Sequence, residues 1–139
     1  MVTRALRVAG AVYLATFLLH TADHLRRGPS ASPRSVLALG TLAAVFQVVA
    51  IVAVLRGSER GPLLAVAVGL PDAVGIVAAH LLPRWGAISD AYPGAPAAAG
   101  VTALSWVTAV AEAAAALAFA WYGWQALRAV RAGRTPAAA

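Results

Sequence analysis

Long stretches of apolar residues dominate this chain, and short polar breaks separate them. A helix that crosses the hydrocarbon core of a bilayer needs about 20 mostly apolar residues. Four stretches reach that length, at about 4–25, 36–55, 62–82 and 101–127. The pattern therefore predicts an all-α protein, an integral membrane four-helix bundle in which residues 1–139 form a single transmembrane domain.

The breaks between these spans are rich in turn-forming residues. Gly28-Pro29-Ser30 follows the first span, and Gly57 to Pro62 follows the second. Clusters of Gly, Pro and Ser mark turns and loops. The longest break, 83–100, is rich in Pro, Gly and Ala, and we predict a flexible loop on the outer side of the membrane. The tail 133–139 is predicted to be disordered.

The third span carries an internal proline and several small residues. Pro71 has no N–H to donate to the carbonyl of Ala67, so a kink or break is expected there. Ala65 and Gly69, and likewise Gly75 and Ala79, are spaced four residues apart, which together with the alanines of the fourth span permits close contact between helices. These features predict tight packing in this part of the bundle.

Composition supports lipid as the solvent of this fold. The chain of 139 residues is 61% hydrophobic and 12% charged, with a mean hydropathy of +0.78. A soluble fold of this size cannot hide so much apolar surface. Cysteine is absent, which excludes disulfides, zinc–thiolate sites, iron–sulfur clusters and thiol catalysis.

The net charge of +6 comes from arginines at the ends of the apolar stretches. Seven arginines lie in the N-terminal end, the second break and the C-terminal tail, and four lie in the other two breaks. The positive-inside rule then places both termini in the cytoplasm. An Ala- and Arg-rich chain without Lys or Asn indicates a bacterial genome rich in GC. We therefore expect a multi-pass protein of the bacterial cytoplasmic (inner) membrane and no nucleic-acid partner.

One hydrogen-bonding residue from each span falls near the middle of the membrane. An ionisable side chain at that depth costs about 2.5–3.5 kcal/mol, so it needs a partner or a water-filled cavity. Counting inward at about 1.5 Å per residue places these side chains about 16–18 Å deep. The predicted midplane layer is Tyr13, Gln47, Asp72 and Glu112. Asp72 and Glu112 are the candidate catalytic residues.

A second polar group lies nearer the outer surface. His20 and His24 are one helical turn apart on the first span and share a face, with Asp23 beside them. His80 lies on the third span, about 5 Å below the outer boundary, and His20 about 9 Å below it. Imidazole and carboxylate groups suit zinc, copper or iron. We predict a metal site formed by His20, Asp23, His24 and His80.

Other functions stay open at this point. His20 and His80 could bind a haem as axial ligands, in a haem-binding membrane subunit. Asp72 and Glu112 could carry protons in a proton-coupled small-molecule transporter, or serve a membrane enzyme acting on a lipid-like substrate. The polar residues could also specify only packing, in a structural accessory subunit. The expected partners are membrane lipids, together with a second copy of the chain or a membrane complex.

Overall fold

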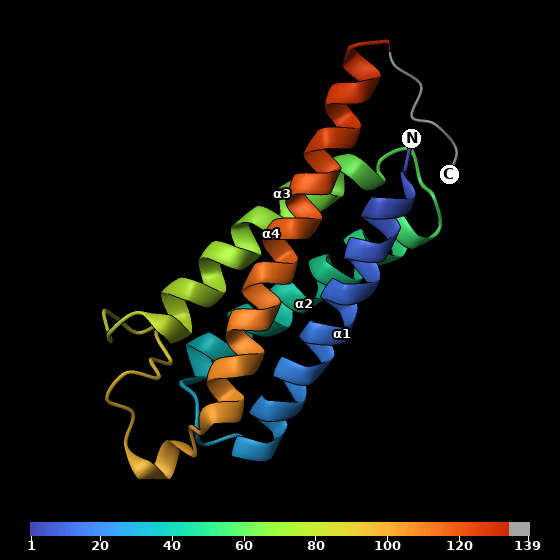
Figure 1. The fold of residues 1–139 in the computed structure, drawn as a ribbon. Helices are drawn as coiled ribbons and strands as arrows, with labels where there is room; N and C mark the ends of the chain where they lie inside the picture. Colours follow the sequence, from blue (N-terminus) through green and yellow to red (C-terminus); the bar gives the residue numbers. More distant parts are fainter. Residues whose placement is uncertain (134–139) are drawn as a thin grey trace.

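The computed structural model describes residues 1–133, and these form a bundle of four long helices without strands (Figure 1). The predicted all-α four-helix bundle is therefore confirmed. Apart from Gly133, the tail predicted to be disordered lies outside the described residues. The helices are α1 (Arg4–Arg27), α2 (Arg34–Leu55), α3 (Gly61–Ile76), the π-helical turn η1 (Val77–Leu81), the 3-10 turn η2 (Ala97–Ala99) and α4 (Ala103–Arg131).

Local sequence signals explain where several helices begin and end. The Thr3 hydroxyl accepts the N–H of Leu6 at 3.2 Å and caps α1, which then ends at Gly28 with φ +86°. Thr102 and Ser105 form a capping box at the start of α4. Such caps satisfy backbone donors that a helix end leaves free.

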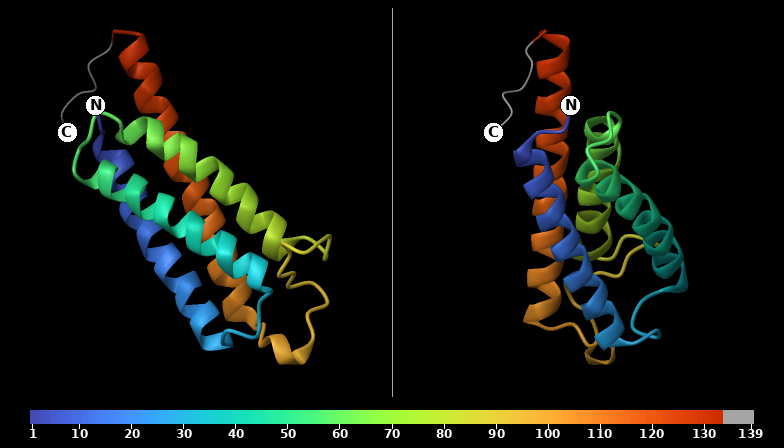
Figure 2. Two further views of the ribbon diagram at one scale, coloured as in Figure 1. Left: turned by 180° about the vertical axis from the view of Figure 1, so that it is seen from behind. Right: turned by 90° about the vertical axis from the view of Figure 1, so that its right-hand side faces the viewer.

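The chain runs up and down, so both ends of the described bundle lie together. The N-terminus and the α2–α3 connection lie at the same end as the last turns of α4, and the other two connections lie at the opposite end (Figure 1). Viewed from the side, α2 diverges from α1 and α4 toward that opposite end (Figure 2). Helix α4 is the central element. Half of the residues in its 18-residue apolar stretch are buried, whereas only 17% are buried in the corresponding stretch of α2.

Large apolar side chains cover much of the outside of the bundle, and several polar side chains lie inside it, as expected for a protein surrounded by lipid. The four helices, with η1 continuing α3, are each long and apolar enough to cross a membrane. Large apolar side chains such as Leu18, Leu19 and Val49 are more than half exposed. In contrast, His20 and Glu112 are buried. An exterior of this kind would be costly in water, and the fold is that of a membrane protein.

Small residues bring α3 and α4 into close contact. A Cβ atom added at Gly69 would lie 2.6 Å from the carbonyl oxygen of Ala116, and one added at Gly123 would lie 2.8 Å from that of Pro62. Backbones can approach so closely only where side chains are absent. The close packing predicted around Gly69 is present.

This contact yields a stability prediction with a matched control. We expect Gly69→Ala to lower the free energy of unfolding by about 1–3 kcal/mol, because the methyl group overpacks against backbone. Gly75→Ala, in the same helix, meets nothing within 4 Å and should leave stability unchanged or raise it by up to about 1 kcal/mol. Unfolding by SDS in mixed micelles measures both. Equal values for the two variants would contradict the packing described.

Helix α3 passes through Pro71 without ending there. Its regular hydrogen bonding changes later, where the N–H of Leu82 donates to the carbonyl of Val77 at 3.1 Å in the π-helical turn η1. Such turns within helices are rare and are found frequently at functional sites. The π-helical turn carries His80.

The connection between η1 and α4 folds back onto the end of the bundle. The N–H of Asp90 donates to the carbonyl of Ala79 at 2.9 Å, and the N–H of Tyr92 donates to that of His80 at 2.8 Å. Ser89, Asp90 and Tyr92 are all buried. These hydrogen bonds pack the segment against η1, and the flexibility predicted from composition stays a prediction.

Candidate metal site

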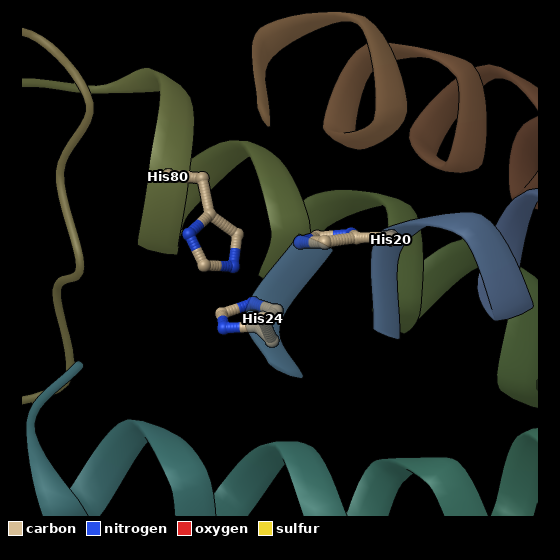
Figure 3. Close-up of side chains that lie close together, drawn as sticks. All are labelled: His20, His24 and His80. Atoms are coloured by element: carbon tan, nitrogen blue, oxygen red, sulfur yellow. The ribbon is translucent and has the colours of Figure 1, made fainter. Parts of the chain in front are cut away.

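Three histidine side chains meet between α1 and the end of α3. The ring centroids of His20 and His24 are 4.8 Å apart, those of His20 and His80 are 5.0 Å apart, and those of His24 and His80 are 5.2 Å apart. One nitrogen of each ring faces the space between them (Figure 3). The nitrogens that could bind an ion lie within 4.8 Å of one another. The structure therefore brings all three predicted histidines into one cluster.

Each of these rings has an oxygen partner at Nδ1. His20 Nδ1 lies 2.6 Å from Glu112 Oε2, and His80 Nδ1 lies 3.2 Å from the carbonyl oxygen of Asp90. His24 Nδ1 lies 3.4 Å from the Ser32 hydroxyl. An imidazole that binds a metal usually donates its other N–H to such an oxygen, which fixes its tautomer and its orientation. With the proton on Nδ1, this network would leave Nε2 of each ring for a ligand.

Asp90 holds this outer network in place. Both of its carboxylate oxygens accept hydrogen bonds from the Arg27 guanidinium, at 2.9 and 3.0 Å, and one also accepts the Ser32 hydroxyl at 2.8 Å. The Arg27 guanidinium is fully buried. Burial alone would raise the pKa of Asp90, but the hydrogen bonds from Arg27 and Ser32 and the charge of Arg27 hold this pKa below its usual range. Asp90 is thus the anion of a buried ion pair that links α1 to the loop.

Tyr92 covers the cluster from the same loop. Its ring lies 4.9 Å from that of His80, and its hydroxyl approaches Nε2 of His20 at 3.5 Å, which is long for a hydrogen bond. Burial raises the pKa of Tyr92, so the hydroxyl keeps its proton. The hydroxyl can therefore donate a hydrogen bond toward the space between the three rings.

Asp23 lies outside the histidine cluster. Its Oδ1 accepts a hydrogen bond from Arg26 at 2.9 Å, and its buried Oδ2 has no hydrogen-bond partner within residues 1–133. Among the described residues, the group of side chains placed closely enough to hold a metal ion comprises His20, His24 and His80 without this carboxylate. A role for Asp23 as a metal ligand remains a prediction.

The residues of the predicted midplane layer form two groups. Asp72 accepts hydrogen bonds from the Tyr13 hydroxyl, at 2.6 Å, and from the Gln47 amide. Glu112 instead pairs with His20. Three residues of the predicted layer therefore form one group around Asp72. The fourth, Glu112, belongs to the histidine cluster. Catalytic roles for Asp72 and Glu112 remain predictions.

Several residues of the site were absent from the predicted set. Ser32, Asp90 and Tyr92 all lie in connections, and sequence periodicity says nothing about where a loop side chain points. The remaining signal is a pair of opposite charges, Arg27 at the end of the first span and Asp90 within the break 83–100, because opposite charges close to lipid tend to pair. Sequence alone could not choose that pair.

Fold and site together define a class: in its described part, an all-α protein with four membrane-length helices and a cluster of three histidines, of which His20 and His80 are buried. Comparisons with protein-family models, with curated proteins and with solved structures found no match for this chain.

Proposed function

We propose that this chain is a membrane protein that binds a transition metal ion, foremost Zn²⁺, through Nε2 of His20, His24 and His80. The observation that supports the proposal most strongly is the oxygen partner at Nδ1 of every ring. Buried imidazole N–H groups need an acceptor in any protein, but here one nitrogen of each ring also faces the space between the three rings (Figure 3). In histidine metal sites an oxygen acceptor usually holds the ring nitrogen that does not bind the metal, and thereby orients the ring.

The donor set fits Zn²⁺ with limited adjustment. Two nitrogens bound at about 2.0–2.1 Å in a tetrahedral site lie roughly 3.3 Å apart, and those of the cluster lie within 4.8 Å of one another. Side-chain rotations that move the nitrogens by about an ångström close this difference. Three protein ligands also leave one position free, as in catalytic zinc sites, where the ion activates a bound water or polarises a substrate oxygen.

A haem fits this arrangement less well. The macrocycle would have to lie between the rings of His20 and His80 as axial ligands. These rings are in edge-to-face contact at 68°, and His24 stacks on His20 at 19°. The imidazole of His24 therefore occupies space that a haem between His20 and His80 would need. The geometry favours a single ion over a haem.

We also propose that the protein lies in the bacterial cytoplasmic membrane with both termini inside. The N-terminus, the α2–α3 connection and the last turns of α4 share one end of the bundle (Figure 1), and the segments at that end carry most of the arginines. The positive-inside rule then places the histidine cluster in the outer half of the membrane. A metal would reach the site from the outer side.

A titration tests the metal proposal. Purified protein in detergent, stripped with EDTA, should bind one Co²⁺ per chain and develop the visible bands of a tetrahedral Co²⁺ complex. Adding Zn²⁺ should then displace the cobalt and remove the bands. Weak binding with several ions per chain, and no tetrahedral spectrum, would contradict the proposal.

The outer partner of His20 offers a graded prediction. Glu112→Ala should weaken Zn²⁺ binding by about 10- to 100-fold, because His20 loses the acceptor that orients it. Glu112→Gln keeps an oxygen at that place and should recover a large part of the affinity. Competition with a chromogenic zinc chelator measures both variants. A Gln variant as weak as the Ala variant would argue against an orienting hydrogen bond.

A further inference from the structure

The buried carboxamide of Gln47 has one half of its hydrogen bonding unmet. Its Nε2 donates to Asp72, but its Oε1 is buried and has no hydrogen-bond partner in the described part of the chain. The whole residue is only 4% exposed. A buried acceptor without a donor is destabilising, so this position calls for a group that brings one.

Gln47 lines a cavity that also contains the three histidines. The cavity has a volume of about 360 Å³ and lies between α1, α2 and α3. His20, His24 and His80 line it together with Gln47 and Asp72. Apolar side chains, among them Phe17, Val36 and Ile76, complete its walls. A molecule in this cavity can therefore contact the Gln47 side chain and the proposed metal site, and it reaches the buried Gln47 oxygen when the carboxamide turns toward the cavity.

A groove on the lipid-facing side leads to the same place. It has a volume of about 680 Å³ between α2 and α3, and it shares Gln47 and Asp72 with the cavity. Leu39 and Phe46 on its rim are about half exposed. A Cβ atom added at Gly40, which lines both volumes, would meet nothing within 4 Å. The apolar groove thus connects the bilayer with the histidine cluster.

We propose that the groove and the cavity together bind a lipid-soluble molecule with a hydrogen-bond-donating head group. The apolar part lies along the groove between α2 and α3, and the head group donates to Oε1 of Gln47. Access is lateral, from the bilayer. The inference deepens the proposed metal function, and it rests on that function for one statement: the bound molecule lies beside the ion.

A matched pair of probes isolates the hydrogen bond. 1-Octanol and its isomer methyl heptyl ether have the same atoms and similar length, but only the alcohol donates a hydrogen bond. We expect the full chain in phosphatidylcholine nanodiscs to bind the alcohol about tenfold more tightly than the ether, since one buried hydrogen bond is lost with the ether. Equilibrium dialysis of the labelled probes measures this, with empty nanodiscs as the background.

Two variants locate the binding site, and a third serves as the control. Gln47→Met removes the acceptor and should abolish the preference for the alcohol. Gly40→Leu fills open space and should reduce binding of both probes to the background, and it leaves the Gln47–Asp72 hydrogen bond in place. Val48→Met introduces the same side chain on the exposed face of α2 and should behave like the parent protein.

Cobalt separates this inference from the metal proposal. In the Co²⁺-loaded protein, the alcohol should shift the visible bands and the ether should not. If the bands never form, the metal proposal fails, and dialysis without metal still decides whether the molecule binds at Gln47. Equal binding of alcohol and ether, or a preference that survives Gln47→Met, would overturn the inference and leave the metal site standing.

Discussion

Replacing His80 with alanine is expected to weaken Zn²⁺ binding by more than roughly 100-fold, beyond the effect of losing an outer partner. The reason is geometric. His20 and His24 come from one helix, and His80 supplies the third nitrogen from η1. Without it, two imidazoles one turn apart on α1 remain, and these cannot complete a three-nitrogen site. His20→Ala and His24→Ala should have comparable effects, measured by competition with a zinc chelator.

Thr21→Ala is the control for these histidine variants. Thr21 lies between His20 and His24 in the chain and lines the same cavity, but it offers no ligand of the kind that zinc prefers. The Thr21→Ala variant should therefore bind Zn²⁺ with an affinity close to that of the parent protein. If His80→Ala bound zinc as tightly as Thr21→Ala, the three-histidine site would be wrong.

Removing the Arg27 guanidinium is expected to destabilise the fold by about 3–5 kcal/mol, the usual cost of leaving a buried charge without its partner. In Arg27→Met the carboxylate of Asp90 would remain buried, with only Ser32 donating a side-chain hydrogen bond to it. The loop that carries Asp90 and Tyr92 should loosen first. SDS unfolding in mixed micelles measures the free energy, and hydrogen exchange locates the loosened segment.

Two further variants show whether the ion pair causes this loss. Arg84→Met removes an arginine that is exposed in the same loop and should change stability by no more than about 0.5 kcal/mol. Adding Asp90→Leu to Arg27→Met removes both charges and should restore much of the stability. A double variant as unstable as Arg27→Met alone would show that the loss has another origin.

The fold could be predicted from sequence because one strong signal dominates it. Apolar stretches of membrane length leave few alternatives to helices, since every backbone group must be hydrogen-bonded within lipid. The proximity of His20 and His24 followed directly from helical spacing. Their meeting with His80 required only that all three lie at similar depth and face the interior.

Depth counting was less accurate for Glu112. The count assumed that every helix starts from one plane at the outer surface, and it placed Glu112 several ångströms deeper than His20. In the structure the two side chains are 2.6 Å apart. The helices are staggered and tilted relative to one another (Figure 2), so equal residue counts do not give equal heights.

The contacts of the loop residues in the site could not be predicted from sequence, for a different reason. Asp90 and Tyr92 lie in a segment of mostly small residues without periodicity, from which the sequence predicts flexibility. Asp90 is held by the Arg27 guanidinium, which is distant in sequence, and the Tyr92 N–H by the carbonyl of His80, a backbone group that no side-chain pattern marks. Such contacts follow from tertiary packing, and a single sequence does not encode them in any readable local pattern.

X-ray absorption spectroscopy of the zinc-loaded protein tests the central claim most directly. We expect a first shell at about 2.0–2.1 Å composed mainly of nitrogen, with the multiple-scattering pattern of three imidazoles, and loss of one imidazole in His80→Ala. A shell of six oxygens, or a spectrum that is identical in the parent protein and His80→Ala, would contradict a metal centre formed by His20, His24 and His80.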